Sequence, residues 1–126
     1  MAFLALIYSH TTSDFSLLNV VENSHTAKPL IYKITGTWGN HEGSMLLWVW
    51  VLSAHGWLFS RFANTDDESK KYALFTQALI AIGFLLFILL TSNPFARIIP
   101  IPYEGEDLNP LLQDIGLAMH PPMLYM

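Results

Sequence analysis

Two long apolar stretches dominate the pattern of hydrophobic and polar positions along the chain. Residues 44–60 (SMLLWVWVLSAHGWLFS) and 73–92 (ALFTQALIAIGFLLFILLTS) contain no Asp, Glu, Lys or Arg. A helix rises 1.5 Å per residue, so about 17 to 25 apolar residues are long enough to cross a bilayer core. The pattern therefore predicts two full transmembrane helices, of which the second is the more apolar.

Partial helices are expected at both ends of the chain. Residues 1–9 (MAFLALIYS) have the character of the last turns of a helix, and they lack the basic n-region of a signal peptide. Residues 120–126 (HPPMLYM) begin a new apolar helix, because proline suits the first helical positions. We therefore expect a fragment of a longer multi-span helical bundle.

A short charged segment, residues 61–72 (RFANTDDESKKY), separates the two long apolar stretches. It holds half of the six basic residues of the chain, namely Arg61, Lys70 and Lys71. Basic loops stay on the cytoplasmic side of bacterial membranes, or on the matrix side in mitochondria. The segment is therefore predicted to be a cytoplasmic or matrix loop.

Residues 10–43 and 93–119 then lie together on the opposite, external face. The first is expected to be an ordered loop with a short surface helix near residues 15–21. In the second, Asn109-Pro110 is a good helix start, and apolar residues follow at helical spacing. This external loop is therefore expected to carry a surface helix.

The composition supports a membrane protein. Apolar residues make up 52% of the chain and charged residues 13%, with a mean hydropathy of +0.37. Soluble chains are about one quarter charged. The net charge of −4 has no basic stripe, which argues against a nucleic acid partner and leaves membrane lipid as the expected surroundings. The predicted fold class is an all-α integral membrane protein.

His120 is the first candidate ligand. The chain has no cysteine, so its five histidines are the side chains best suited to bind a metal or a haem iron. A residue before proline has restricted backbone freedom, and the positive end of a helix dipole disfavours imidazolium. His120 is thus expected to present a neutral imidazole suited to haem ligation. The alternative is an interfacial histidine with an ordinary hydrogen bond.

His41 and Glu42 stand at the opening of the first long apolar helix, where they could either anchor the helix or contact a ligand. His55 lies fourteen residues after His41, roughly 21 Å along a helix axis, so one iron cannot bind both. His55 is expected either to hydrogen-bond within the bundle or to contact a cofactor. Gly56 beside it would allow a close helix approach. No hydrolase or nucleotide-binding motif is present.

Four motifs in register give the chain a family resemblance. They are TWGNHEGSMLLWVW, GFLLFILLTSNPF, DLNPLLQD and GLAMHPPMLYM. In this order and at these separations they resemble the CcmF-type haem lyase family of the system I cytochrome c maturation pathway, which has relatives in nitrite reductase assembly. The resemblance covers nearly the whole chain.

The resemblance implies a many-helix protein of the bacterial or mitochondrial inner membrane, with its haem site facing the periplasm or intermembrane space. The family joins haem vinyl groups to the cysteine thiols of apocytochrome c at a CxxCH motif. Haem arrives from a CcmE-type haem chaperone, and a CcmH-type partner reduces the thiols. A second, membrane-embedded haem b is thought to help reduce the iron.

Residue by residue, the resemblance identifies His120 with the first of two external axial ligands of the haem iron. His41, within the TWGNHEGS signature, is a second candidate haem contact, and the chemical role of that signature is left open. The tryptophan-rich haem platform, the second axial histidine and the ligands of the embedded haem belong to later parts of the family. The remaining segments of the same lyase are therefore expected partners, and this chain alone is expected to be inactive.

Two other interpretations remain open. A structural or proton-handling subunit of a respiratory assembly would use His55, Glu42 and Gln77 as polar contacts or as a proton route. A small soluble helical protein would instead bury the two apolar helices in a partner.

Overall fold

The computed structural model describes residues 1–106 and 110–125, and within them the chain is helical with no strand. The predicted all-α class is confirmed. The elements in chain order are α1 (Ala2–Thr11), α2 (Leu18–Asn23), α3 (Leu30–Gly36), α4 (His41–Phe62), α5 (Asp67–Thr91), a 3-10 turn η1 (Pro110–Gln113) and α6 (Ile115–Tyr125).

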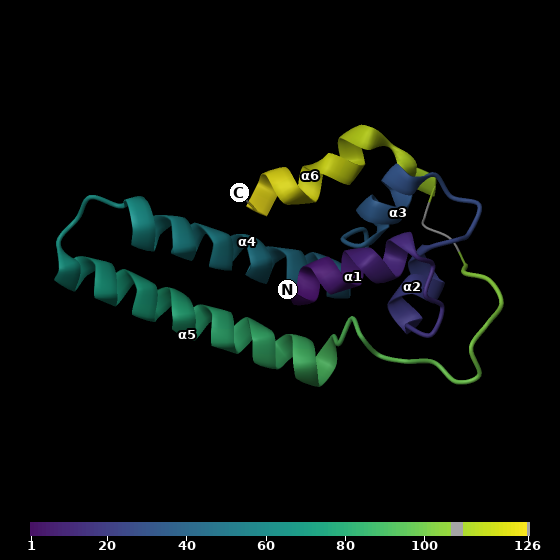
Figure 1. The fold of residues 1–126 in the computed structure, drawn as a ribbon, viewed down its shortest axis with the longest axis horizontal. Coiled ribbons are helices and arrows are strands. Elements are labelled where there is room, and N and C mark those ends of the chain that lie inside the picture. The colour runs from purple at the N-terminus through teal and green to yellow at the C-terminus, as the bar shows by residue number, and fades with distance from the viewer. Residues whose placement is uncertain (107–109, 126) are drawn as a thin grey trace.

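Helices α4 and α5 form a long antiparallel hairpin that projects away from the rest of the chain (Figure 1). The rings of Trp48 and Phe84 lie with their centroids 4.1 Å apart across the hairpin. Nearer the turn, Gln77 Nε2 donates a hydrogen bond to the carbonyl oxygen of Leu52. Gly56 faces this amide, since a Cβ built on it would lie 2.8 Å from Gln77 Nε2. The close helix approach expected at Gly56 is present.

Both hairpin helices begin earlier than predicted, because each has a side-chain N-cap. The Asn40 side chain accepts a hydrogen bond from Gly43 N, and the Asp66 carboxylate accepts one from Ser69 N, each at 2.8 Å. The connection is therefore only residues 63–66. The predicted loop 61–72 is wrong in its bounds, and the three basic residues assigned to it lie on the helix ends: Arg61, Lys70 and Lys71.

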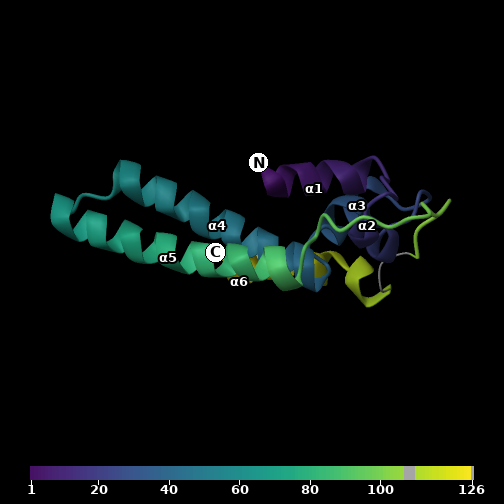
Figure 2. The same cartoon turned by 90° about the horizontal axis from the view of Figure 1, so that it is seen from below.

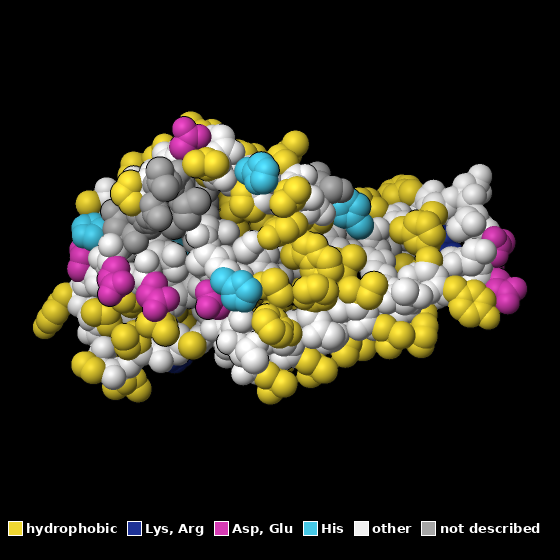
Figure 3. Space-filling model, turned by 180° about the vertical axis from the view of Figure 1, so that it is seen from behind, with side chains coloured by type: hydrophobic (Ala, Val, Ile, Leu, Met, Phe, Trp, Pro, Cys, Tyr) yellow, Lys and Arg dark blue, Asp and Glu magenta, His cyan; other side chains and the backbone are white. Residues whose placement is uncertain are grey.

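Helix α5 is the one helix in the described part of the chain that is long and apolar enough to cross a membrane, judged by length and composition. Only 6% of its most apolar window is buried. The prediction of two clear spans is therefore wrong on this measure. Helix α4 is long enough, but it carries three tryptophans and His55, which are less apolar than leucine or isoleucine. Figure 3 shows hydrophobic side chains spread along the hairpin surface.

The other helices gather at the end of the hairpin far from its turn (Figures 1 and 2). Helix α1 packs against α3 and α4, and Phe95 packs against both apolar clusters of the core. Within the predicted loop 10–43, the short helix expected near residues 15–21 is present as α2, whereas α3 was not expected. A helix as short as α3 depends on packing rather than on propensity, which hides it from sequence periodicity. The two clusters contain Phe3, Leu6, Leu46, Leu47 and Val51, and Phe15, Leu17, Val20 and Val21.

Helix α6 begins at Ile115 rather than at residue 120. The Asp114 carboxylate accepts hydrogen bonds from Gly116 N at 2.7 Å and Leu117 N at 3.2 Å, and so caps the helix. His120 therefore lies within α6, and the argument from the dipole at a helix start does not apply to it. The predicted surface helix is divided between η1 and the first half of α6, while its expected cap, Asn109, lies outside the described residues.

We expect alanine to be better tolerated at Gly83 than at Gly56 in the hairpin. Alanine is favoured over glycine in a helix by about 0.5 to 1 kcal/mol. At Gly83 nothing lies within 4 Å of a new Cβ, so Gly83→Ala should not destabilise the hairpin. At Gly56 the methyl group displaces the Gln77 amide from Leu52 O, which costs about 1 kcal/mol.

Thermal unfolding of the full-length protein containing this chain, in detergent, provides the measurement. Gly56→Ala should unfold at a lower temperature than Gly83→Ala. Equal midpoints would show that the helices do not depend on close approach at Gly56.

Candidate functional site

The TWGNHEGS signature, residues 37–44, forms the turn between α3 and α4 and the start of α4. Asn40 holds the turn from inside, because its Nδ2 donates to Gly36 O at 3.0 Å while its Oδ1 accepts from Gly43 N. A Cβ at Gly43 would lie 1.6 Å from Thr37 O, so any other residue forces the turn to open. Asn40 and Gly43 are therefore needed to keep this turn closed.

A buried chain of hydrogen bonds connects this turn to α1 and α2. His10 Nε2 donates to Asn19 Oδ1 at 2.9 Å, and Asn19 Nδ2 donates to Asn40 Oδ1 at 2.8 Å. His10 is fully buried, although sequence analysis found nothing to distinguish it. The missed signal is its spacing from Phe3 and Leu6, which places all three residues on the buried face of α1.

Burial lowers the pKa of His10 below its ordinary value. The hydrogen bond with Asn19 raises the pKa and the nearby positive charge of Lys28 lowers it, both by less than the burial does. His10 Nδ1 has no hydrogen-bond partner among the described residues. His10 is therefore neutral in the folded protein, and protonation opposes the packing of α1.

Helix α6 has an inner and an outer face. Ala118 is buried and Tyr125 half-buried on the inner side, where α6 packs against α3 and α4. The outer face is exposed and carries His120 among apolar side chains three or four residues away along the helix. These neighbours are Leu117, Met123 and Leu124.

Two polar contacts attach the inner face of α6 to the signature turn. Trp38 Nε1 donates a hydrogen bond to Ala118 O at 2.7 Å. Ser44 Oγ and Tyr125 Oη share a hydrogen bond of 2.7 Å. Two motifs about 80 residues apart in the sequence, TWGNHEGS and HPPMLY, are therefore in direct contact.

A cavity of about 350 Å³ lies between the start of α4 and the inner side of α6. His41 lines it together with Trp38, Pro121 and Tyr125. The exposed imidazole of His41 also meets the ring of Phe87 edge-on, at 6.2 Å between centroids.

The two predicted site histidines are not brought together. His120 does not line the cavity that contains His41, and no hydrogen bond or ring contact joins the two within the described chain. His120 instead faces outward from α6. The described residues also contain no group of three or more His, Asp or Glu side chains arranged to hold a metal ion.

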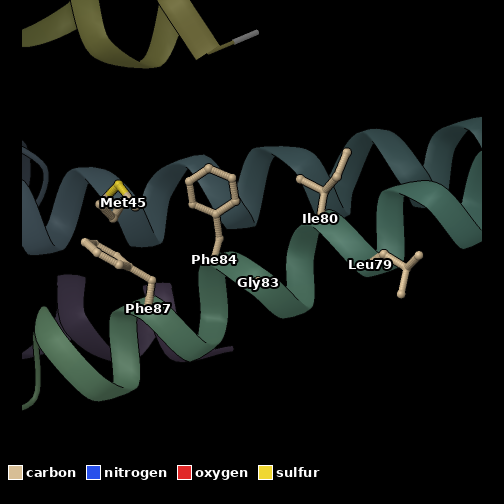
Figure 4. Close-up of a pocket in the computed structure, with 6 residues that line it drawn as sticks. All are labelled: Met45, Leu79, Ile80, Gly83, Phe84 and Phe87. Carbon is tan, nitrogen blue, oxygen red and sulfur yellow. The ribbon is translucent and has the colours of Figure 1, made fainter.

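An apolar groove of about 450 Å³ runs between α4 and α5 beside this region (Figure 4). Phe84 and Phe87 point from α5 towards α4, where Met45 lies, and Gly83 leaves the floor of the groove open. Phe87 contacts His41, so the groove lies next to the signature turn. Its lining contains no ionisable side chain.

The remaining polar candidates have local partners. His55 Nδ1 bonds to Val51 O of its own helix at 2.8 Å, and Gln77 bonds across the hairpin to Leu52 O. His25 lies 3.8 Å from the Glu104 carboxylate. Hydrogen bonds from the hydroxyl and the backbone N–H of Thr26 lower the pKa of Glu104. None of these groups points to a reaction site.

Comparison with known proteins gives a consistent result. The cytochrome C assembly protein family matches residues 38–126. The chain is 61% identical over 126 residues to the cytochrome c-type biogenesis protein CycK of Bradyrhizobium diazoefficiens. It is 48% identical over 131 residues to CcmF of Escherichia coli, and 47% identical over 121 residues to NrfE of Haemophilus influenzae.

These alignments cover 95 to 99% of this chain but only 19 to 20% of the relatives. The chain thus spans about a fifth of the length of the curated relatives it matches. No solved structure matches it significantly.

We expect the stability of the folded protein to fall as the pH drops below about 6.5, the ordinary pKa of histidine. Above that value His10 is neutral in both the folded and unfolded states, so it contributes no pH dependence. Below it the unfolded state binds a proton that the buried His10 resists, and the free energy of unfolding decreases until the folded pKa is reached.

Unfolding midpoints of the full-length protein at about pH 7.5 and pH 5.5 test this expectation. His10→Gln should flatten the pH dependence, because it removes the buried imidazole. An unaltered pH profile in His10→Gln would contradict it.

Proposed function

Because this chain belongs to the cytochrome c assembly protein family, we propose that it forms part of a membrane haem lyase that attaches haem covalently to apocytochrome c. His120 is an axial ligand of the haem iron in this proposal. The observation that carries it is the exposed imidazole of His120 on the outer, apolar face of α6.

The residues around His120 fit haem. A porphyrin has broad apolar faces, and an axial histidine must reach the iron from one of them. Leu117, Met123 and Leu124 are all at least half exposed and surround the imidazole with apolar surface. No carboxylate or cation lies among these neighbours to compete for the ring or to change its charge.

This chain's own contribution would be to bind haem and to fix its orientation. His120 would hold the iron from one side, and the apolar face of α6 would exclude water from that side of the porphyrin. Bound haem supplies the vinyl groups that become thioether bonds with the CxxCH cysteines of the apocytochrome. The second axial histidine, the tryptophan-rich platform and the ligands of an embedded haem b would come from the remaining segments of the lyase.

Helix α5 crosses the inner membrane in this proposal, with α4 packed against it. Exposed apolar side chains along α5 and α4 support lipid or neighbouring helices as their surroundings. Three basic residues at the hairpin turn favour the cytoplasmic or matrix side there. Helix α6 lies beside the opposite end of α4, which supports a position of His120 on the side of the periplasm or intermembrane space (Figure 1).

The proposed partners would act on the same external side. Apocytochrome c and a CcmE-type haem chaperone would approach the external side on which α6 lies, as would a CcmH-type thiol-reducing protein. A proton route through the hairpin is less well supported, because His55 and Gln77 are already bonded to backbone carbonyls.

Replacing His120 by glycine in the complete lyase tests the proposal. We expect the haem content of the purified complex to fall on the order of 10-fold or more, because an axial ligand is lost. Added imidazole should restore both the haem absorbance and the yield of covalent cytochrome c. His25→Gly is the matched control, since His25 is a partly exposed loop histidine paired with Glu104.

Replacing His41 by glycine separates the two candidate histidines. His41 lines the cavity between α4 and α6, whereas His120 is exposed on the outer face of α6, so His41→Gly should retain haem without added imidazole. Normal haem content and cytochrome yield in His120→Gly would refute the axial role.

A further inference from the structure

We propose that Trp38 is a positioning residue for His120. Its indole N–H holds the backbone carbonyl that Pro122 leaves without a helical donor, and so fixes the direction in which α6 presents the imidazole. The inference rests on the proposed function of His120. It adds that the signature turn, through Trp38, orients the His120 imidazole.

The need for an external donor follows from the HPP motif. In an α-helix the carbonyl of residue 118 accepts from the N–H of residue 122. Pro122 has no N–H, and its ring crowds the carbonyl one turn earlier. Ala118 is buried, so water does not replace the missing donor. Trp38 Nε1, at 2.7 Å, supplies the hydrogen bond instead.

Trp38 is itself held firmly. It packs against the core cluster that includes Phe3, with ring centroids 6.3 Å apart. It stands two residues before Asn40, whose side chain fixes the signature turn. The indole donor is therefore anchored to the part of the chain where α1 and α4 meet.

Because both residues belong to one helix, fixing the position of Ala118 also fixes the direction in which His120 points. Each residue turns the helix by 100°, so His120 lies about 200° from Ala118, on nearly the opposite side. Tyr125 is seven residues after Ala118 and lies on the same side, where it bonds to Ser44. Two contacts to the signature turn thus bracket His120 and set the rotation of α6 about its axis. A helix free to rotate would not hold the imidazole in one direction.

A pair of substitutions isolates the Trp38 hydrogen bond from simple packing. Trp38→Phe keeps an aromatic ring but removes the N–H. Pro122→Ala restores a backbone N–H to the helix, which can bond to Ala118 O without the indole. Made in the complete lyase, Trp38→Phe should lower haem affinity about 10-fold, as for the loss of an outer-shell partner. It should also shift the haem absorbance maximum and reduction potential.

The double variant distinguishes the loss of the hydrogen bond from the loss of indole packing. Trp38→Phe combined with Pro122→Ala should recover haem affinity, absorbance maximum and potential, and Pro122→Ala alone should remain close to the parent. Trp57→Phe is the control for an indole lost at a site away from α6, because Trp57 of α4 is exposed and contacts Phe62. Immunoblotting checks that each variant reaches the membrane in equal amount.

Two results would overturn the inference. One is a Trp38→Phe lyase with the parent's haem affinity and potential, and the other is a double variant no better than Trp38→Phe alone. Failure of the proposed function is recognised separately, because His120→Gly would then retain haem. Loss of haem in His120→Gly together with either result refutes only the role of Trp38.

Discussion

The fold of this chain depends on the hydrogen bonds of one side chain, Asn40. Its oxygen caps α4 through Gly43 N and also accepts from Asn19, while its nitrogen closes the preceding turn on Gly36 O. The Asn40 amide is partly buried, and its donors and acceptor are satisfied within the chain, so these contacts support one another. The end of α3, the start of α4 and the position of Trp38 all follow from it.

Sequence reasoning located the features that composition and periodicity can reveal. The two apolar stretches became α4 and α5, and the tight hairpin contact at Gly56 was expected from its small size. The helix ends were missed because caps such as Asn40 and Asp66 extend a helix beyond its apolar run. The short helix expected near residues 15–21 is present as α2, a few residues further along, whereas α3 was missed because a helix of seven residues depends on tertiary packing.

The site was predictable only in part, for a related reason. His120 and the TWGNHEGS signature were recognisable as motifs, but their contact spans 80 residues and no local pattern encodes it. One clue was available, since a proline at position 122 must leave the carbonyl of residue 118 without its usual donor. The identity of the new donor, Trp38, depends on how α6 packs against the turn. The burial of His10 is likewise a property of the packed fold.

The outward orientation of His120 has a consequence for how cargo moves through such a protein. The inner face of α6 is fastened to the core, whereas the outer face has no covering within the described chain. A planar molecule bound on the outer face contacts the chain on one side only, at α6. It could bind and leave from the uncovered side without any change in the core behind α6. If the proposed haem lyase function holds, this open side would let haem depart after each reaction while α6 keeps its position.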